Sequence, residues 1–378
     1  MKKVCAFFIA VVLLVTAYIP TIEVKAMSQE DSYFYAKSKL IAAIENKEAS
    51  VDISDCLLSP EFAEQLYYDV ITSNPLLYYV EPTFDENMYT IAEANEFYSE
   101  RIATFTFDYI ITDTTETDAI FEECIKDAEA EIKADGMHAV DIMISIHDYI
   151  AANVNKTEKL SVVEDDMLCS SAYGALVYGC ADSLGYSLLN KLLAEQLTGN
   201  DCIVVADDEH TIFWNMYLLS GNWYHIDIYS DDYETYFYDS NNEKTDLYSV
   251  GGAITHTYLL ITDYDLAAVG HYSAGAFIYD GTPVSNNDTI KIRIWSNISS
   301  RMYYADGYWY YVSPSASYRL VKRVTDVAII YSEELVVAEG FEPIFSIAVD
   351  GDKVFYSTEN TVYKRGIDGM NEETVYTA

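Results

Sequence analysis

The chain has 378 residues and a formal net charge of −39, because 61 acidic residues outnumber 22 basic ones. A surface this acidic repels phosphate backbones and anionic lipid headgroups, which argues against nucleic acid and bilayer surfaces as partners. Hydrophobic residues make up 51% of the chain, so a buried core is expected. The length that remains after the first segment, about 350 residues, suffices for two or three domains.

The first segment, residues 1–26, has the three features of a secretory signal peptide. Lys2 and Lys3 precede an apolar run over residues 4–19, and the small-residue exit Val24-Lys25-Ala26 follows. The apolar run is shorter than the roughly 18 to 20 residues of a membrane span, and no later segment approaches that length. We expect a protein that is secreted or held at the cell surface, with no membrane insertion after cleavage. An uncleaved anchor is the alternative.

Residues 27–135 are predicted to form an N-terminal extension of helices and short strands. Apolar residues at helical spacing indicate a helix over residues 32–46, and Ser59-Pro60-Glu61 has the cap and the first-turn proline that begin a second one. That helix ends before Pro75, since the residue preceding a proline disfavours helical geometry. Strands are expected over residues 76–80 and 102–111.

Residues 136–288 are expected to form a domain in which helices pack on an antiparallel sheet. Helical periodicity marks residues 119–134 and 139–154, and a further helix begins near Ser183. Beyond Gly199 the pattern changes to that of strands. The predicted strands cover residues 202–206, 210–219 and 223–229. Together with the N-terminal extension, these elements predict the α+β class.

The last part, residues 289–378, is predicted to be all β and weakly repetitive. Asp306-Gly307 and its surrounding tyrosines are echoed around Asp350-Gly351, 44 residues later, which is the period of a propeller blade. The closing residues 367–371 resemble the turn of YWTD-type propeller repeats. Two copies are too few to close a ring, because propellers use about four to eight blades. We expect a partial propeller-like or sandwich unit, and two unrelated hairpins are the alternative.

Cysteines and histidines give no indication of a metal site. Five cysteines lie outside the signal peptide, at positions 56, 124, 169, 180 and 202. An odd number cannot all pair within one chain, so we interpret most of them as small buried apolar residues, with at most one or two disulfides. His147 and His225 are interpreted as packing residues. Neither a metal nor another cofactor is expected.

A set of short motifs between Ile146 and Tyr272 resembles the bacterial transglutaminase-like family, a branch of the papain-related superfamily. The motifs come in the family's order and with most of its spacings, although no single one is specific. They are Ile146-His147-Asp148-Tyr149-Ile150, residues 171–179, Gly185-Tyr186, Trp214-Asn215-Met216 and residues 221–227. Residues 73–80 resemble the N-terminal extension of exported members, and residues 258–271 resemble the segment that closes the domain.

The resemblance implies a particular chemistry. In that family, a cysteine at the start of a helix is activated by a histidine on a facing strand, and an aspartate on the next strand orients the histidine. The cysteine position, two residues before the Gly-Tyr pair, is Ser183 in this chain. The histidine position, two residues before the Trp-Asn pair, is Ile212, and the aspartate position is Asp227. Because only the aspartate is intact, the resemblance implies a degenerate catalytic site.

Two residues near these positions keep an enzymatic function as an alternative. His210 lies two residues before the family's histidine position, and residues two apart share one face of a strand at about 6.5 Å. A triad of Ser183, His210 and Asp227 therefore requires the strand to bulge. Cys180, in the turn before the helix, is the other candidate nucleophile, although we interpret it as a buried structural cysteine.

Three functions are compatible with this pattern. A non-catalytic module that binds an extended peptide or a glycan is favoured, because the nucleophile and the base are missing while Trp214, Trp223 and Tyr224 of the family cleft are retained as binding residues. The alternative is a serine- or cysteine-based amide or ester hydrolase, or an acyl transferase of the transglutaminase type. The third is a surface scaffold that displays the C-terminal unit. The sequence does not predict the oligomeric state.

Overall fold

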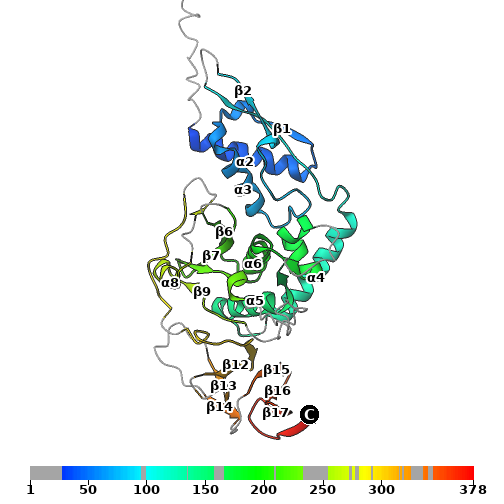
Figure 1. Cartoon of the computed structure of the whole chain (residues 1–378), viewed down its shortest axis with the longest axis vertical. Helices are drawn as coiled ribbons and strands as arrows, with labels where there is room; N and C mark the ends of the chain where they lie inside the picture. Colours follow the sequence, from blue (N-terminus) through cyan, green and yellow to red (C-terminus); the bar gives the residue numbers. More distant parts are fainter. Residues whose placement is uncertain are drawn as a thin grey trace, which may run out of the picture.

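Three parts follow one another along the long axis of the computed structural model, in the order of the sequence (Figure 1). The structure describes residues 28–94, 99–133, 135–156, 166–207, 210–232, 254–271, 275–276, 281–290, 293–314, 316, 319–324, 335–338 and 344–378. The predicted signal peptide, residues 1–26, lies outside them. Helices are combined with mostly antiparallel sheets, so the chain has the predicted α+β class. None of the helices in these ranges has the length and apolarity needed to cross a membrane.

The N-terminal part joins two helices to a small sheet. Helix α2 (Gln29–Glu45) begins at a capping box in which Ser28 and Asp31 exchange hydrogen bonds. Helix α3 (Ala63–Ser73) follows a 3-10 turn that starts at Pro60. The sheet, in the order β1-β3-β2, is formed by β1 (Ser50–Asp52), β2 (Tyr89–Ala92) and β3 (Arg101–Thr106).

The strand predicted over residues 76–80 is not formed. The backbone turns there, with hydrogen bonds from the Leu77 amide to the Asn74 carbonyl and from the Val80 amide to the Leu77 carbonyl. A strand would place alternate side chains on opposite faces. Leu77, Tyr78, Tyr79 and Val80 are instead all buried. A turning backbone places four consecutive apolar side chains in the core, which an extended one on a half-exposed sheet does not.

The middle part contains a five-stranded sheet with helix α6 (Ser183–Thr198) against one face (Figure 1). The strands lie in the order β10-β6-β7-β8-β9, and each neighbouring pair is antiparallel. Their bounds are β6 (Cys202–Ala206), β7 (Phe213–Leu219), β8 (Asn222–Ile226), β9 (Leu259–Ile261) and β10 (Gly275–Ala276). The remaining elements are α4 (Thr115–Ile132) and α5 (Ala139–Asn153) beside α6, the pair β4 (Asn155–Lys156) and β5 (Cys180–Ala181), and the short helices α7 (Ile228–Asp231) and α8 (Asp263–Ala268).

Side chains of β7 alternate between two hydrophobic clusters. Phe213 and Tyr217 join the main core with the leucines of α6, whereas Trp214 and Met216 join a second cluster on the opposite face of the sheet. Asn215 lies on the α6 side, where its side-chain amide is hydrogen-bonded to that helix. The sheet is therefore fixed to α6 through both apolar and polar contacts.

The C-terminal part consists of two four-stranded antiparallel sheets, β11-β12-β13-β14 and β15-β16-β17-β18. Each of the two predicted sequence repeats forms one of these sheets, while the propeller-like interpretation remains a prediction. The first sheet comprises β11 (Tyr303–Ala305), β12 (Tyr308–Ser313), β13 (Arg319–Arg323) and β14 (Leu335–Ala338). The second comprises β15 (Ser346–Asp350), β16 (Lys353–Ser357), β17 (Thr361–Gly366) and β18 (Glu373–Thr377).

The first hairpins of the two sheets use different tight turns, which shifts the repeat by one residue. In the first sheet Ala305 pairs with Tyr308, and both loop residues have positive φ. In the second sheet Asp350 pairs with Lys353, and the positive φ falls on Gly351 at the first loop position. Equivalent positions are thus 45 residues apart, as Ala305 and Asp350 are, and not the 44 that the Asp-Gly pairs indicate.

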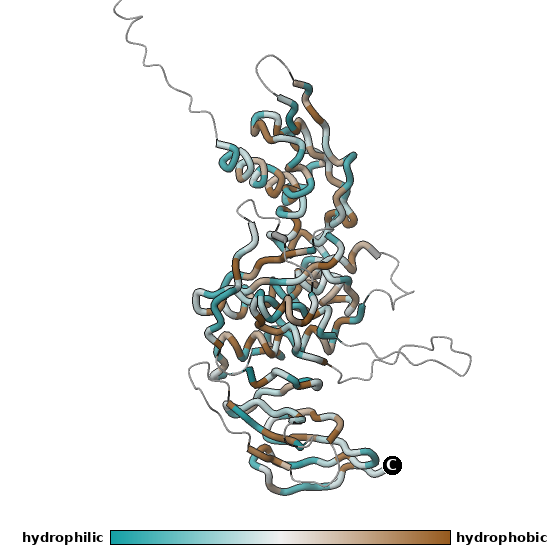
Figure 2. Tube along the Cα trace, turned by 60° about the vertical axis from the view of Figure 1, so that its left-hand side comes forward, coloured by the Kyte–Doolittle hydropathy of each residue, from teal (hydrophilic) through white to brown (hydrophobic). Residues whose placement is uncertain are grey.

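With this spacing, the two sheets stack head to tail. Trp309 and Tyr311 of the first sheet belong to the main core, whereas Tyr310 belongs to a separate cluster shared with the second sheet. Val354 and Tyr356, the equivalents of Trp309 and Tyr311, face the first sheet in that cluster. The same face of each sheet therefore packs on the unit that precedes it. Hydrophobic residues accordingly run through all three parts of the molecule (Figure 2).

Trp309 also links the C-terminal part to helix α5. Its indole N–H donates a hydrogen bond of 2.8 Å to Asp141 Oδ1, and both side chains are buried. The amide of His138, which precedes the helix, donates to the other carboxylate oxygen. Burial raises the pKa of Asp141, while these donors oppose the rise.

Replacing Trp309 by phenylalanine should lower the free energy of unfolding by about 1 to 3 kcal/mol, because the buried Asp141 carboxylate loses a donor. Denaturant-induced unfolding measures the change. Tyr308→Phe is the control, since it removes only a hydroxyl from the half-buried neighbouring residue. It should change the stability by less than about 0.5 kcal/mol. Equal losses in the two variants would contradict the role given to the indole N–H.

Candidate functional site

Ser183, at the family's nucleophile position, is the first residue of helix α6. Asp182 caps the helix by accepting a hydrogen bond of 2.9 Å from the Gly185 amide. The Ser183 hydroxyl accepts a hydrogen bond of 3.1 Å from the amide of Phe213, where β7 begins. The residue is 6% exposed. Its hydroxyl thus joins the start of the helix to the start of the strand.

A disulfide and a close backbone contact hold the loop that leads into α6. Cys169 and Cys180 form the disulfide, with their Cα atoms 5.5 Å apart. At Gly185, a Cβ atom would lie 2.4 Å from the carbonyl oxygen of Cys169, so glycine is required there. A cysteine acts as a nucleophile only as a free thiolate, and the sulfur of Cys180 is bonded to that of Cys169. The disulfide agrees with the interpretation of Cys180 as a buried structural cysteine, and it leaves no free thiol at this position.

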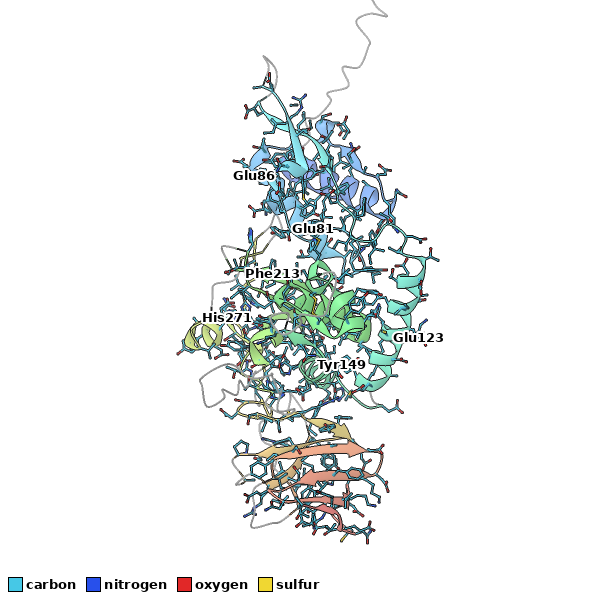
Figure 3. All side chains as sticks on the ribbon, turned by 45° about the vertical axis from the view of Figure 1, so that its right-hand side comes forward. Glu81, Glu86, Glu123, Tyr149, Phe213 and His271 are labelled. Carbon is cyan, nitrogen blue, oxygen red and sulfur yellow. A yellow bond between two sulfur atoms is a disulfide. The ribbon has the colours of Figure 1, made fainter. Side chains whose placement is uncertain are left out.

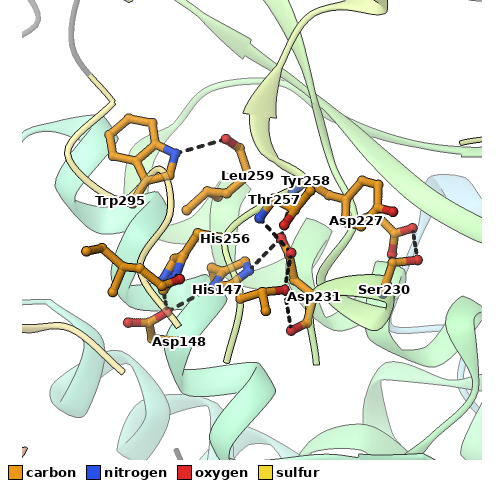
Figure 4. Close-up of polar contacts among 12 residues, drawn as sticks. His147, Asp148, Asp227, Ser230, Asp231, His256, Thr257, Tyr258, Leu259 and Trp295 are labelled. Atoms are coloured by element: carbon orange, nitrogen blue, oxygen red, sulfur yellow. Dashed lines mark hydrogen bonds and ion pairs between the residues drawn. The ribbon is translucent and has the colours of Figure 1, made fainter. Parts of the chain in front are cut away.

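Asp227, the retained aspartate, follows strand β8 and is 1% exposed. It caps helix α7 by accepting hydrogen bonds from the amide and the hydroxyl of Ser230, at 2.9 and 2.6 Å (Figure 4). Its Oδ2 also lies 2.7 Å from Nε2 of His271. A histidine does contact the retained aspartate, but it comes from a segment that follows α8.

His271 lies beside α8 (Figure 3), and its ring packs between two aromatic rings. Its ring centroid lies 4.7 Å from that of Trp214 and 5.2 Å from that of Tyr258, both in edge-to-face contact. Its side chain is 4% exposed. Sequence reasoning placed His271 at the end of the segment that closes the domain and gave it no role. Asp227 and His271 are 44 residues apart in the sequence, so no short motif indicates that they are in contact.

His210 is directed to the N-terminal part of the molecule. It lies in a turn and has a φ of +54°. The Asp207 carboxylate accepts hydrogen bonds from the amides of Thr211 and Ile212 in this turn, and β7 begins only after it. Its Nδ1 lies 3.1 Å from Glu64 of α3, and its ring centroid lies 5.2 Å from that of Tyr68. Among the described residues, no hydrogen bond links it to Ser183, so the structure does not assemble the Ser183/His210 pair that the triad requires.

The aromatic residues predicted to bind a ligand differ in their exposure. Trp214 and Tyr224 are fully buried, whereas Trp223 is half-buried. Ile212, at the family's histidine position, packs against the same cluster as Trp214 and Trp223. Buried rings of this kind stabilise the sheet. Trp223 is thus the most exposed of the three rings.

His225 is held as a neutral ring. Its Nδ1 accepts the indole N–H of Trp214 at 3.2 Å, so the proton of the ring is on Nε2, which donates to Asp263 at 2.8 Å. Burial lowers the pKa of His225, against the opposing effect of Asp263. The interpretation of His225 as a packing residue agrees with these contacts.

A second group of histidines and aspartates is buried between α5, α7 and the residues that precede β9 (Figure 4). His147 Nδ1 lies 2.9 Å from Asp148 Oδ1, and His147 Nε2 lies 3.2 Å from Asp231 Oδ2. His256 Nε2 lies 2.8 Å from Asp148 Oδ1, and its Nδ1 lies 3.0 Å from the carbonyl oxygen of Ile298. The four side chains are at most 2% exposed. We call these four residues the buried quartet.

The hydrogen bonds of the buried quartet determine where its protons are. An ionised carboxylate only accepts hydrogen bonds, so both nitrogens of His147, which face Asp148 and Asp231, carry protons. Burial alone would lower the pKa of His147, but the hydrogen bonds and charges of Asp148 and Asp231 raise it to about 9. The two histidines hold the pKa of Asp148 below its usual range, against the effect of burial. The His147 imidazolium thus lies between two carboxylates.

Three members of the quartet are also of the types that bind transition metals. Ligand atoms of His147, Asp148 and His256 lie within 4.8 Å of one another. Each ring nitrogen already lies at hydrogen-bonding distance from an oxygen, so protons satisfy the group as it stands. A metal ion would have to displace those protons. The prediction that the chain uses no metal remains a prediction.

An open cavity of about 370 Å³ adjoins the buried quartet. Residues 255–269 form one wall, and residues 293–299 form the other. His256 and Trp295 line it, and both are buried. The Trp295 indole is fixed by a hydrogen bond of 3.0 Å to the carbonyl of Leu259 (Figure 4). The indole ring of Trp295 is thus held in place where it lines the cavity.

Comparisons with known proteins do not assign the chain to a family. No family model and no curated protein matches the chain. The solved structures include one described as a crystal structure of a TGase, at 15% sequence identity and a TM-score of 0.24. The match covers 37% of this chain and 43% of that one, which is less than half of either. A likeness this weak carries no weight for function.

Replacing His271 by alanine should lower the free energy of unfolding by about 3 kcal/mol, because Asp227 would keep a buried charge without its imidazole partner. His210→Ala is the matched control, since its partner Glu64 is half-exposed. That variant should lose less than about 1 kcal/mol. Denaturant unfolding of the two variants compares them, and a loss in His271→Ala no larger than in His210→Ala would refute the buried pair.

Alkaline pH should weaken the fold through His147. Its pKa is raised in the folded chain from 6.5 to about 9, so the stabilisation is complete below pH 6.5 and is lost as the pH rises through 9. We expect the free energy of unfolding to fall by about 1 to 3 kcal/mol over this range. His147→Gln should be less stable at pH 6.5 and nearly flat over the same range. A flat profile for the unchanged chain would show that the imidazolium is not needed.

Proposed function

We propose that the chain is an exported transglutaminase-like protein whose middle domain, residues 136–288, binds an extended peptide or a glycan and does not catalyse acyl transfer. One observation carries the proposal. The hydroxyl of Ser183, at the nucleophile position, is buried and accepts a hydrogen bond from the amide of Phe213. A group held in this way serves the packing of α6 on the sheet, and it is a poor nucleophile without an adjacent base.

The other two positions of the family site support the same proposal. Ile212, at the histidine position, has no group that can act as an acid or a base, and it packs against an apolar cluster. The Asp227 carboxylate is bonded to Ser230 and His271 and is not free to orient a base on β7. Each position that the family uses for chemistry therefore has a structural role here.

Export is supported by two independent features. Residues 1–26 have the pattern of a signal peptide, and disulfides such as Cys169–Cys180 form and persist in oxidising compartments outside the cytoplasm. We place the protein outside the cell or on its surface. The N-terminal extension, residues 27–135, and the all-β unit, residues 289–378, complete the proposed domain organisation.

A hydrolase is the second candidate, and one contact favours it. The hydrogen bond between His271 and Asp227 preserves a histidine–aspartate pair, which a serine hydrolase uses to activate its hydroxyl. In this case Ser183 would have to leave the Phe213 amide and meet an imidazole. The cleaved bond would be an amide or an ester.

Restoring the two missing groups tests the proposal. We expect the double variant Ser183→Cys/Ile212→His to react with iodoacetamide at position 183 at least about tenfold faster than Ser183→Cys alone, because an imidazole lowers the pKa of a neighbouring thiol. Ser187→Cys, one turn further along α6, is the control. Mass spectrometry separates the labelled site from Cys56, Cys124 and Cys202, which are not in the disulfide.

The unchanged chain should be inert to serine-directed and thiol-directed activity probes and should neither deamidate casein nor incorporate amines into it. Labelling of Ser183 by a serine-directed probe, abolished by His271→Ala or by His210→Ala, would instead establish the hydrolase.

A further inference from the structure

The second sheet of the C-terminal part, β15-β16-β17-β18, has two faces with different surroundings. Paired residues of neighbouring antiparallel strands have their side chains on the same face. The inner face, which includes Val354 and Tyr356, packs on the first sheet. We call the opposite face the outer face. Its apolar members, as the strand pairing places them, are Ala348, Phe355, Val362 and Tyr376.

The apolar residues of the outer face are accessible. Phe355 and Val362 are half-buried, and Tyr376 is 62% exposed. In the part of the chain that the structure describes, none of the four belongs to a hydrophobic cluster. Apolar side chains of neighbouring strands thus lie together at the surface, which marks a candidate interaction surface.

The equivalent face of the first sheet is covered. The register of both sheets shifts at the same place, after Leu320 in one and after Val362 in the other, so these two residues are equivalent. Phe355 is likewise the equivalent of Tyr310. Leu320 and Tyr310 are fully buried in the cluster shared with the second sheet. A sheet of the same repeat therefore covers this surface in the first sheet, whereas the second sheet presents it to solvent.

A second copy of the chain can supply a sheet of the same kind. In each copy the inner faces of both sheets are already in contact, the first with the middle part and the second with the first sheet. The outer face of the second sheet is the one that stays accessible. Two copies that continue the stack must therefore share this face, in a contact with two-fold symmetry.

The charges on the outer face permit such a contact. The chain as a whole has a net charge of −39, so two copies repel each other at most orientations. The strands place two acidic and two basic side chains on the outer face, and their charges cancel. They are Asp350, Lys353, Lys364 and Glu373. Lys364 and Glu373 form an ion pair of 2.9 Å. Two outer faces can thus approach without net charge on either.

We propose that the chain forms a symmetric dimer in which the outer faces of two second sheets pack against each other. One sheet face offers fewer side chains than the roughly 20 to 30 residues that each partner contributes to a stable interface. The dimer should therefore be weak and reversible, with a dissociation constant in the micromolar range or above. This association goes beyond the proposed binding function and does not depend on it. A dimer would carry two middle domains, so a ligand with repeated units could engage both.

Sedimentation velocity of the mature chain, residues 27–378, tests the proposal over concentrations from about 1 to about 500 µM, which span weak association. We expect the weight-average mass to rise from that of one chain toward that of two. Tyr376→Glu should weaken the association by about tenfold or more, because each copy would bury a carboxylate without a partner. Tyr264→Glu is the matched control, since Tyr264 is an exposed tyrosine of α8 in the middle part. Its association constant should equal that of the unchanged chain.

Val362→Thr keeps the test decisive if Tyr376→Glu fails to fold, since it retains the shape of the side chain and its preference for strands. It should weaken the association by about fivefold or more, because the dimer would bury the added hydroxyl. A mass that stays at one chain throughout would leave the outer face to a different partner and overturn the proposal. Association that neither outer-face variant changes would place the contact elsewhere. Assemblies that grow beyond two chains would rule out a symmetric contact.

Discussion

Two buried carboxylates, Asp148 and Asp231, hold together segments that are distant in the sequence. Asp231 accepts hydrogen bonds from the hydroxyl of Thr255 and from two amides of the segment that follows it, while Asp148 accepts from the amide of Met302. An ionised carboxylate that is buried away from water is stable only when hydrogen-bond donors surround it. These two acidic groups therefore fix helix α5, helix α7, the residues before β9 and the entry to the C-terminal sheets relative to one another.

The same constraint shapes the cavity. The segment that Asp231 anchors contains His256 and Thr257, and both line the cavity, so one wall of the cavity is fixed by the buried quartet. The positions where the transglutaminase-like family performs chemistry contribute differently, since Ser183 and Asp227 join elements of the middle part.

The sequence predicts the elements well where local pattern decides, and less well where tertiary contacts do. Strand β6 has the predicted bounds, and helix α6 begins at Ser183, near which its start was predicted, because apolar periodicity is a local signal. Residues 76–80 were misjudged because four successive apolar side chains are all buried by a turning backbone. At the site, Asp227 was found from its motif, but its histidine partner arrives from 44 residues away, and no spacing encodes that contact.

Head-to-tail stacking gives the C-terminal part a direction. The second sheet packs on a surface that only the folded first sheet provides, through Tyr310 and Leu320, whereas the first sheet packs on the middle part through Trp309 and Tyr311. In such arrays each unit is stabilised by its own contacts and by those with its neighbours. Under heat or mechanical force, unfolding should begin at the C-terminal end. The second sheet should then unfold while the first is still packed on the middle part.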